Sequence, residues 1–288
     1  MQLGLCCVLL SLSKMSTTTE TRELNQWAPV ASLEAPYPLK DLLSVFLSPE
    51  EQEQIHEQFT HACHPNSQVM WSGVARAEAQ KWADERGLQT LTTAMGPLMD
   101  ECNPLCLKSK KNQKRWSLYM KGASVLFAFH ASRGSKVTVL LPPPPNTRNP
   151  CGLSNYQLVE EPVLQGLIGG PSVECINIVH PTVAGAENFS YQSWPIDMTA
   201  QWIEGFPNPV APPPQWRLVK SNSKIRRIKT VLASAAARLF PGVPTVVDSL
   251  RTPETACKSA ELQVRKARIP IVLKEMTSCS SSRHARGY

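Results

Sequence analysis

A run of four prolines at positions 142–145 constrains the fold more than any other feature of the sequence. It follows residues 136–141 (KVTVLL), an apolar segment of strand length, and it ends that strand because proline has no N–H group to donate to a sheet. A second apolar segment, residues 173–180, ends before Pro181 in the same way. Two such strands joined by a long connection are typical of a parallel sheet, because parallel neighbours need a crossover rather than a hairpin.

Helix-forming segments flank these two strands. Residues 48–51 (SPEE) combine a serine cap, a proline at the first helical position and a glutamate that can reach back to the cap, so they predict a helix to about Cys63. We also expect residues 68–72 to be extended and the Thr-rich residues 88–99 to form an ordered loop. The remaining helices before the proline-rich region are expected at residues 75–86, 113–132 and 195–206.

This order of elements predicts an α+β fold of α/β-like character, with a helical N-terminal part, a small parallel β-sheet part and a flexible basic C-terminal tail. Residues 207–215 contain the sequence PNPVAPPP, which is typical of a polyproline-type linker. The linker divides the chain into a leader at residues 1–24, a main domain at residues 25–206 and a basic tail at residues 216–288. Within the tail, residues 224–240 have the apolar spacing of a basic helix.

The basic character of the chain belongs to this tail. Residues 216–288 hold 15 lysines and arginines against four acidic residues, a net charge of +11, so the first 215 residues carry −4 of the total of +7. Such a tail can make weak, nonspecific contact with nucleic acid or acidic lipid. The alternative is a solvated extension, partly helical or disordered, that has no ligand.

Hydropathy and cysteine usage bear on the location of the protein. The longest apolar run, residues 3–12, falls short of the roughly 18 to 20 residues that cross a bilayer, so we expect no transmembrane segment. The nine cysteines are odd in number and irregularly spaced, which favours reduced thiols and a cytoplasmic location. Secretion is the alternative, because residues 1–13 have the length of a signal peptide, although the first cation, Lys14, follows the apolar run.

Several common catalytic motifs are absent from the sequence. It contains no GxxxxGK[ST] phosphate loop, no strand-bounded GxGxxG, no HExxH and no GxSxG. The pair Cys102 and Cys106 lacks the CxxC spacing of a zinc site and has no matching second half. We therefore expect no metal site.

Short polar and aromatic motifs do occur in a definite order along the expected elements. They are WSG at 71–73, TLT at 90–92, SVLFA at 124–128 and VEEPVL at 159–164. In this order and spacing, residues 68–206 resemble the ADP-ribosyl cyclase and NAD glycohydrolase superfamily, especially its toxin-type microbial members. The resemblance implies that residues 25–206 form an NAD-cleaving catalytic domain.

The resemblance also implies roles for individual residues. Glu160 matches the catalytic glutamate, and Trp71 matches the tryptophan that forms a wall of the nicotinamide site. Ser72 and Ser124 match polar neighbours of the diphosphate and the ribose.

Three further positions follow the family less closely. Tyr156 resembles the aromatic residue of the phosphate loop, and Asn155 stands where a phosphate-contacting threonine is usual. Thr92 stands where the family has an acidic residue that contacts the nicotinamide amide, and a second active-site tryptophan is absent near Met120. These departures favour hydrolysis over cyclisation, because cyclisation requires water exclusion and a folded-back adenine.

Four of these residues also have an ordinary structural interpretation. Glu160 would be a solvated turn residue beside Pro162, and Trp71 would be a core aromatic at the end of a strand. Ser124 would be a small residue at a helix contact, and Tyr156 would be a loop anchor.

We expect an NAD glycohydrolase that cleaves the bond between nicotinamide and ribose, with NAD as substrate and without a cofactor. Loss of neutral nicotinamide leaves an oxocarbenium-like sugar, and a fixed carboxylate stabilises the charge that develops in the transition state. We assign this role to Glu160. The alternatives are a protein ADP-ribosyltransferase, in which Glu160 or Glu161 orients NAD, and a non-catalytic binding protein that uses the basic tail.

Overall fold

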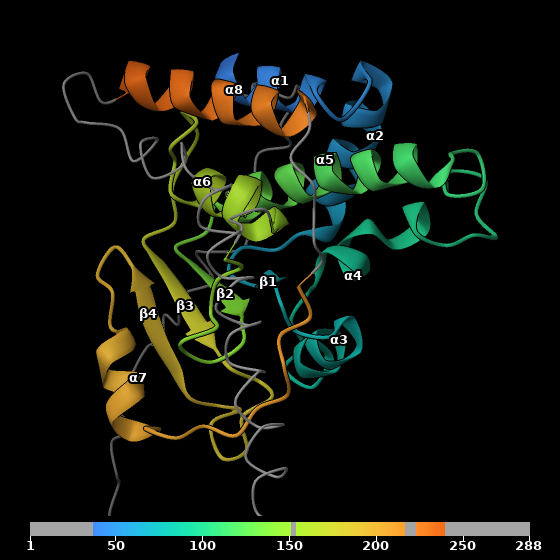
Figure 1. The fold of residues 1–288 in the computed structure, drawn as a ribbon. Coiled ribbons are helices and arrows are strands. Elements are labelled where there is room, and N and C mark those ends of the chain that lie inside the picture. Colours follow the sequence, from blue (N-terminus) through green and yellow to red (C-terminus); the bar gives the residue numbers. More distant parts are fainter. Residues whose placement is uncertain (1–36, 151–153, 217–222, 240–288) are drawn as a thin grey trace, which may run out of the picture. The chain divides into compact units, whose positions relative to one another are not determined.

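The computed structural model describes residues 37–150, 154–216 and 223–239, and these contain a four-stranded sheet in the order β1-β2-β3-β4 (Figure 1). The strands are β1 (Val69–Trp71), β2 (Lys136–Leu140), β3 (Cys175–Val179) and β4 (Ser190–Trp194). The pairs β1–β2 and β2–β3 are parallel, and β3–β4 is antiparallel. This mixed architecture, with N-terminal helices and a mostly parallel sheet, confirms the predicted fold class.

The central strands β2 and β3 are the two apolar segments that end before prolines. Their side chains alternate between the two faces of the sheet, as the period of two requires. Val137 and Val139 pack in the larger of two hydrophobic clusters, whereas Leu140 packs in the smaller one. Because both faces of these strands are covered, their sequences are almost continuously apolar.

The antiparallel edge strand β4 was not expected from the sequence. Only Tyr191 among its five residues is buried, and serine and glutamine occupy other positions. A strand with so few apolar residues has no clear alternation, and its pairing with β3 comes from the fold around it.

The helices follow the local signals of the sequence in most places. Ser48 and Glu51 form the predicted capping box, since the Ser48 Oγ accepts from the Glu51 N–H at 3.3 Å and the Ser48 N–H donates to Glu51 Oε2 at 3.1 Å. The first helix, by contrast, was not expected. The helices are α1 (Tyr37–Ser44), α2 (Pro49–Ala62), α3 (Arg76–Asp84), α4 (Leu91–Met95), η1 (Gly96–Leu98), α5 (Gln113–Ala131), η2 (Tyr156–Glu160), α6 (Glu161–Leu164), α7 (Thr199–Gly205) and α8 (Ser223–Leu239).

The larger hydrophobic cluster joins one face of the sheet to α1, α2, α5 and α6, and the long helix α5 contacts each of these helices (Figure 1). The smaller cluster lies on the other face and includes side chains of α3, such as Trp82. Along β1, Met70 enters the larger cluster, while Val69 and Trp71 face the smaller one. The alternation of β1 therefore decides which of its side chains can meet α5.

The expected loop at residues 88–99 is instead partly helical. Residues Leu91–Met95 form α4 and Gly96–Leu98 form η1. Thr90 caps α4, because its Oγ1 accepts from the Thr93 N–H at 3.4 Å. The threonines that suggested a loop therefore begin a short helix, as Ser and Thr often do at the cap position.

The Pro-rich segment after α7 returns to the end of β1. The Gln215 N–H donates to the Gly73 carbonyl at 2.9 Å. Beyond it, α8 contacts α1 and buries Ile225, Ile228 and Leu232. The expected leader at residues 1–24 and residues 240–288 of the expected tail lie outside the described residues, and the predicted domain boundaries stay a prediction.

Gly73 is the glycine whose replacement should disturb this arrangement most. Its φ is +72°, and a methyl group there would lie 2.3 Å from Trp216 and 2.8 Å from Pro142. We expect Gly73→Ala to lower the free energy of unfolding by about 1–3 kcal/mol in urea titrations. Gly87→Ala is the control, because Gly87 has a similar φ of +62° and no atom of the described residues lies within 4 Å of the added group. Equal losses in both variants would contradict the packing of Trp216 on Gly73.

Candidate functional site

Glu160 and Ser124 form a buried pair between two elements of the fold. Glu160 is the last residue of the π-helical turn η2, and Ser124 lies within α5. The Ser124 Oγ donates to Glu160 Oε1 at 2.5 Å. Glu160 is only 7% exposed, and Ser124 is only 2% exposed. The structure thus brings together two of the predicted site residues.

Burial changes the acidity of Glu160. Its low solvent exposure raises the pKa of the carboxyl to about 7, while the hydrogen bond from Ser124 acts in the opposite direction. A carboxyl with this pKa exchanges its proton near neutral pH. Such a perturbed group is more frequent at functional sites than in ordinary cores.

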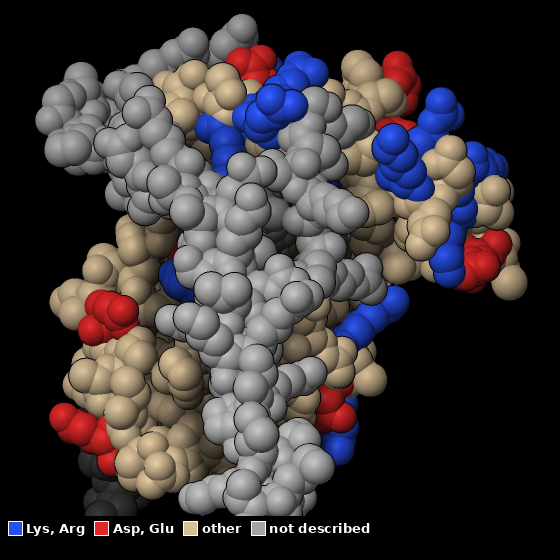
Figure 2. Space-filling model, viewed as in Figure 1, with Lys and Arg blue, Asp and Glu red and all other residues tan. Residues whose placement is uncertain are grey.

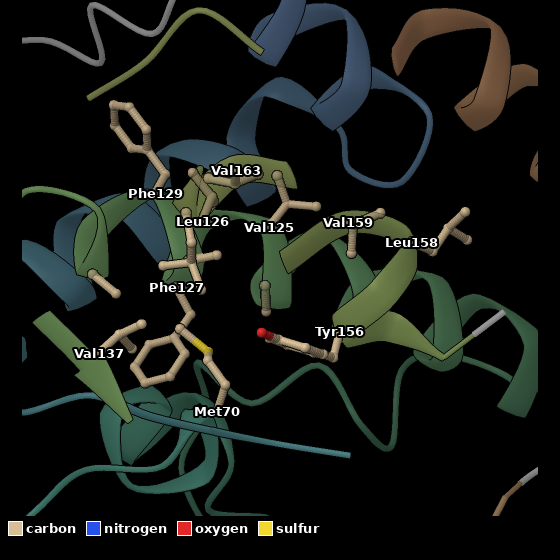
Figure 3. Close-up of a cluster of buried hydrophobic side chains, with 14 of the residues drawn as sticks. Met70, Val125, Leu126, Phe127, Phe129, Val137, Tyr156, Leu158, Val159 and Val163 are labelled. Atoms are coloured by element: carbon tan, nitrogen blue, oxygen red, sulfur yellow. The ribbon is translucent and has the colours of Figure 1, made fainter. Parts of the chain in front are cut away.

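Tyr156 lies in the same turn, and its side chain points into the larger hydrophobic cluster (Figure 3). It is 2% exposed, and burial raises the pKa of its hydroxyl well above the usual value, with further contributions from the charges of Glu161 and, to a smaller extent, Glu160. Within the part of the chain that the structure describes, the hydroxyl has no hydrogen-bond partner. Asn155, the residue before η2, is half-buried and makes no side-chain capping bond to the turn.

The other predicted site residues lie elsewhere. Trp71 is half-buried against the smaller cluster, on the face of the sheet opposite to Met70. Ser72 is buried, and its N–H donates to the Leu140 carbonyl at 3.0 Å. Thr92 is half-buried in α4. Among the described residues, none of these three predicted site residues has a hydrogen bond to Glu160 or Ser124.

Two cavities lie at the carboxyl ends of the parallel strands. They have volumes of about 420 and about 400 Å³. Prolines of 142–145 and 207–214 line the first, and Gly73, Glu78 and Thr182 help to line the second. Ligands of open parallel sheets usually bind at this edge. Neither Glu160 nor Ser124 lines either cavity, so the buried pair is separate from both.

Sequence reasoning missed the ion pair between Arg148 and Glu161. The Arg148 Nη1 and Nη2 donate to Glu161 Oε2 and Oε1 at 2.7 and 2.6 Å. Glu161 directly follows Glu160, so this pair lies beside the candidate site. No spacing rule connects an arginine in the loop after β2 with a glutamate in a short helix, and only the fold brings them together.

A buried histidine pair was also missed. His56 Nδ1 of α2 lies 3.0 Å from His130 Nε2 of α5, and both side chains are 3% exposed. Burial lowers the pKa of His130 to about 3 and also lowers the pKa of His56. The pair joins two helices of the larger cluster, and one of its rings must donate to the other in the neutral state.

A metal site and a membrane-spanning helix both find no support in the described residues. In that part of the chain, no group of three or more His, Cys, Asp or Glu side chains is arranged to hold a metal ion. None of the helices described is both long enough and apolar enough to cross a membrane.

Comparisons with known proteins identify no similar protein. No protein-family model, no curated protein and no solved structure matches the chain.

The raised pKa of Glu160 predicts a pH-dependent difference between the wild type and Glu160→Gln. The unfolded glutamate ionises near its ordinary value of 4.5 and the folded one at about 7, so the wild type loses stability as the pH rises between these values. The variant stays neutral. Its free energy of unfolding, relative to the wild type, should therefore rise by up to about 3 kcal/mol over this range and then level off.

Urea titrations at a series of pH values measure this difference. Subtracting the two curves removes the contribution of the histidine pair, which both proteins share. Glu174→Gln, which replaces an exposed glutamate, is the matched control for the substitution itself. A constant difference between the wild type and Glu160→Gln from pH 4 to pH 8 would show that the carboxylate is not held in a desolvated site.

Proposed function

We propose that this protein is an NAD glycohydrolase in which Glu160 stabilises an oxocarbenium-like transition state. The observation that carries the proposal is the buried pair of Ser124 and Glu160, which are joined at 2.5 Å. The order of the sequence motifs independently assigns these two residues to one site. Their contact across 36 residues of sequence supports that assignment.

The reaction is balanced without a cofactor. The bond between ribose C1′ and the nicotinamide nitrogen breaks, and its electron pair leaves with the nicotinamide. Water then adds to C1′ and releases a proton to solvent, which gives ADP-ribose. Ionised Glu160 interacts most strongly with the positive charge on the sugar, which is fullest in the transition state. Because nicotinamide leaves as a neutral group, no general acid is required.

Access to the carboxylate is part of the proposal. Glu160 is 7% exposed and lines neither cavity, so the nicotinamide ribose can reach it only after η2 or the neighbouring side chains move. Exclusion of bulk water has a catalytic benefit, because the charge of the carboxylate acts more strongly in a site of low dielectric constant.

The location we propose is the cytoplasm, where reduced thiols such as the free Cys63 and Cys175 persist.

Nicotinamide release from NAD tests the proposal directly. We expect Glu160→Gln to reduce release by at least about 100-fold, because it removes the charge that stabilises the transition state. Glu174→Gln should retain the wild-type rate. No release from the wild-type protein, or undiminished release from Glu160→Gln, would overturn the assignment.

The pH dependence of the same assay gives a second prediction. Activity should rise as the pH increases through about 7, since only ionised Glu160 stabilises the sugar cation. In Ser124→Ala the hydrogen bond that lowers the pKa of Glu160 is lost. The rising part of the pH–activity curve should therefore move to higher pH, and activity well above pH 8 should recover toward the wild-type value. A rising part that stays at the wild-type pH in this variant would contradict the role of Ser124.

One observation favours a second candidate function. Figure 2 shows blue Lys and Arg side chains gathered over α8, where Arg226 and Arg227 are exposed. A binding protein that uses this basic surface should lose affinity for nucleic acid steeply as salt rises, and should lose it altogether on truncation after Pro214. Incubation with labelled NAD tests the transferase alternative. A transferase would move labelled ADP-ribose onto a protein acceptor.

A further inference from the structure

The loop between η1 and α5 ends in a strongly basic segment. Residues 108–115 have the sequence KSKKNQKR, which contains five lysines and arginines and no acidic residue. The first 215 residues together carry a net charge of −4, so this positive charge is local. Figure 2 shows blue Lys and Arg side chains gathered over this loop and the beginning of α5. A dense basic segment of this kind is typical of a surface that meets an acidic partner.

Ion pairs within the fold neutralise only two of these five cations. Lys108 pairs with Glu101 of the same loop, and Lys111 pairs with Glu51 of α2. The other three are exposed, and no acidic side chain in the described part of the chain pairs with them: Lys110, Lys114 and Arg115. The segment therefore presents three uncompensated positive charges to solvent.

Two of these charges stand where a helix disfavours them. Lys114 and Arg115 lie in the first turn of α5, which contains no acidic residue. Because the N-terminus of a helix carries a partial positive charge, acidic side chains are favourable there and basic ones are not. Asn112 caps the helix, since its Oδ1 accepts from the Arg115 N–H at 3.0 Å. The two cations do not stabilise the helix, which favours a role outside the fold.

An exposed leucine lies beside this charge. Leu105 is 50% exposed, whereas the next residue, Cys106, is 3% exposed. Asn103 fixes the turn, because its Oδ1 accepts from the Leu105 N–H and its carbonyl accepts from the Cys106 N–H, both at 3.0 Å. The Lys110 ammonium group donates to the Pro104 carbonyl at 2.9 Å. A fixed turn thus displays an apolar side chain next to an ammonium group.

We propose that this loop binds the surface of an acidic lipid membrane, with Leu105 entering the boundary between headgroups and acyl chains while the three uncompensated cations contact the headgroups. Buried apolar area and attraction to anionic lipids both strengthen such binding. A nucleic-acid backbone would engage the cations but not the leucine. Residues 99–112 also contain no aromatic side chain on which a base could stack. The proposal is independent of NAD cleavage.

Sedimentation of the full-length protein with lipid vesicles measures this binding. Vesicles of phosphatidylcholine containing about 30% phosphatidylserine supply the acidic surface, and pure phosphatidylcholine vesicles are the comparison. We expect binding to the acidic vesicles that weakens as salt rises, and little binding to the neutral ones. Joint replacement of Lys110, Lys114 and Arg115 by glutamine should lower the partition coefficient about 100-fold, because each cation near the surface contributes about fivefold.

Two further variants separate the position of the charges from their number and from the leucine. Lys40, Arg76 and Lys81 are exposed cations of other helices, and their joint replacement by glutamine should leave the partition coefficient within about twofold of the wild type. Leu105→Asn changes no charge. It should lower the partition coefficient about fivefold, because the half-exposed leucine no longer enters the interface, and it should leave binding to a single-stranded DNA oligonucleotide unchanged.

Hydrogen exchange locates the contact. On acidic vesicles, amide exchange should slow at residues 101–112 in the wild type and not in the triple loop variant. Equal partition of that variant and the wild type, or protection confined to residues 216–288, would overturn the proposal. Wild-type vesicle binding by Leu105→Asn, with loss of both vesicle and DNA binding in the triple loop variant, would indicate a general polyanion surface and would also overturn it.

Discussion

The hydrogen bond between Ser124 and Glu160 is the interaction on which the account depends. A carboxylate buried in a protein interior loses its hydration, and a single hydroxyl donor replaces only part of what water supplied. An apolar side chain in that place would pack against the same neighbours without this cost. The chain nevertheless places Glu160 there, on the same turn as Tyr156, whose hydroxyl has no hydrogen-bond partner among the described residues. Residues that break the local rule of burial in this way usually have a functional reason.

The sheet separates Ser124 and Glu160 from Trp71, which the order of the motifs had placed in the same site. Alternation along β1 turns Met70 toward α5 and Trp71 toward the smaller cluster. The cavities lie at the carboxyl edge, between the two proline-rich segments. The proposed chemistry at Glu160 therefore requires movement of the turn or its neighbours, and contacts of Glu161 with Arg148 and of Gln157 with Asn149 hold this turn to the loop after β2. The raised pKa of Glu160 and the restricted access to its carboxyl group both result from burial.

Local signals explain how much of this fold could be predicted. Prolines end β2 and β3, and the capping box begins α2, so sequence alone locates these elements. The edge strand β4 has a single buried residue, and its position follows from pairing with β3. Residues of the π-helical turn and of α6 contact Arg148 and Asn149 of the preceding loop, and no periodicity of the sequence predicts these contacts. For the site, motif order paired Ser124 with Glu160, whereas the burial of Glu160 and its neighbour's ion pair required the tertiary structure.

A crystal structure of Glu160→Gln with bound NAD tests the central claim most directly, because the variant should retain the uncleaved substrate. We predict that the nicotinamide ribose lies within hydrogen-bonding distance of the residue 160 side chain, with Ser124 beside it and η2 displaced from its position in the free protein. NAD bound only in the cavities between the proline-rich segments, with residue 160 still enclosed against Ser124, would contradict the account.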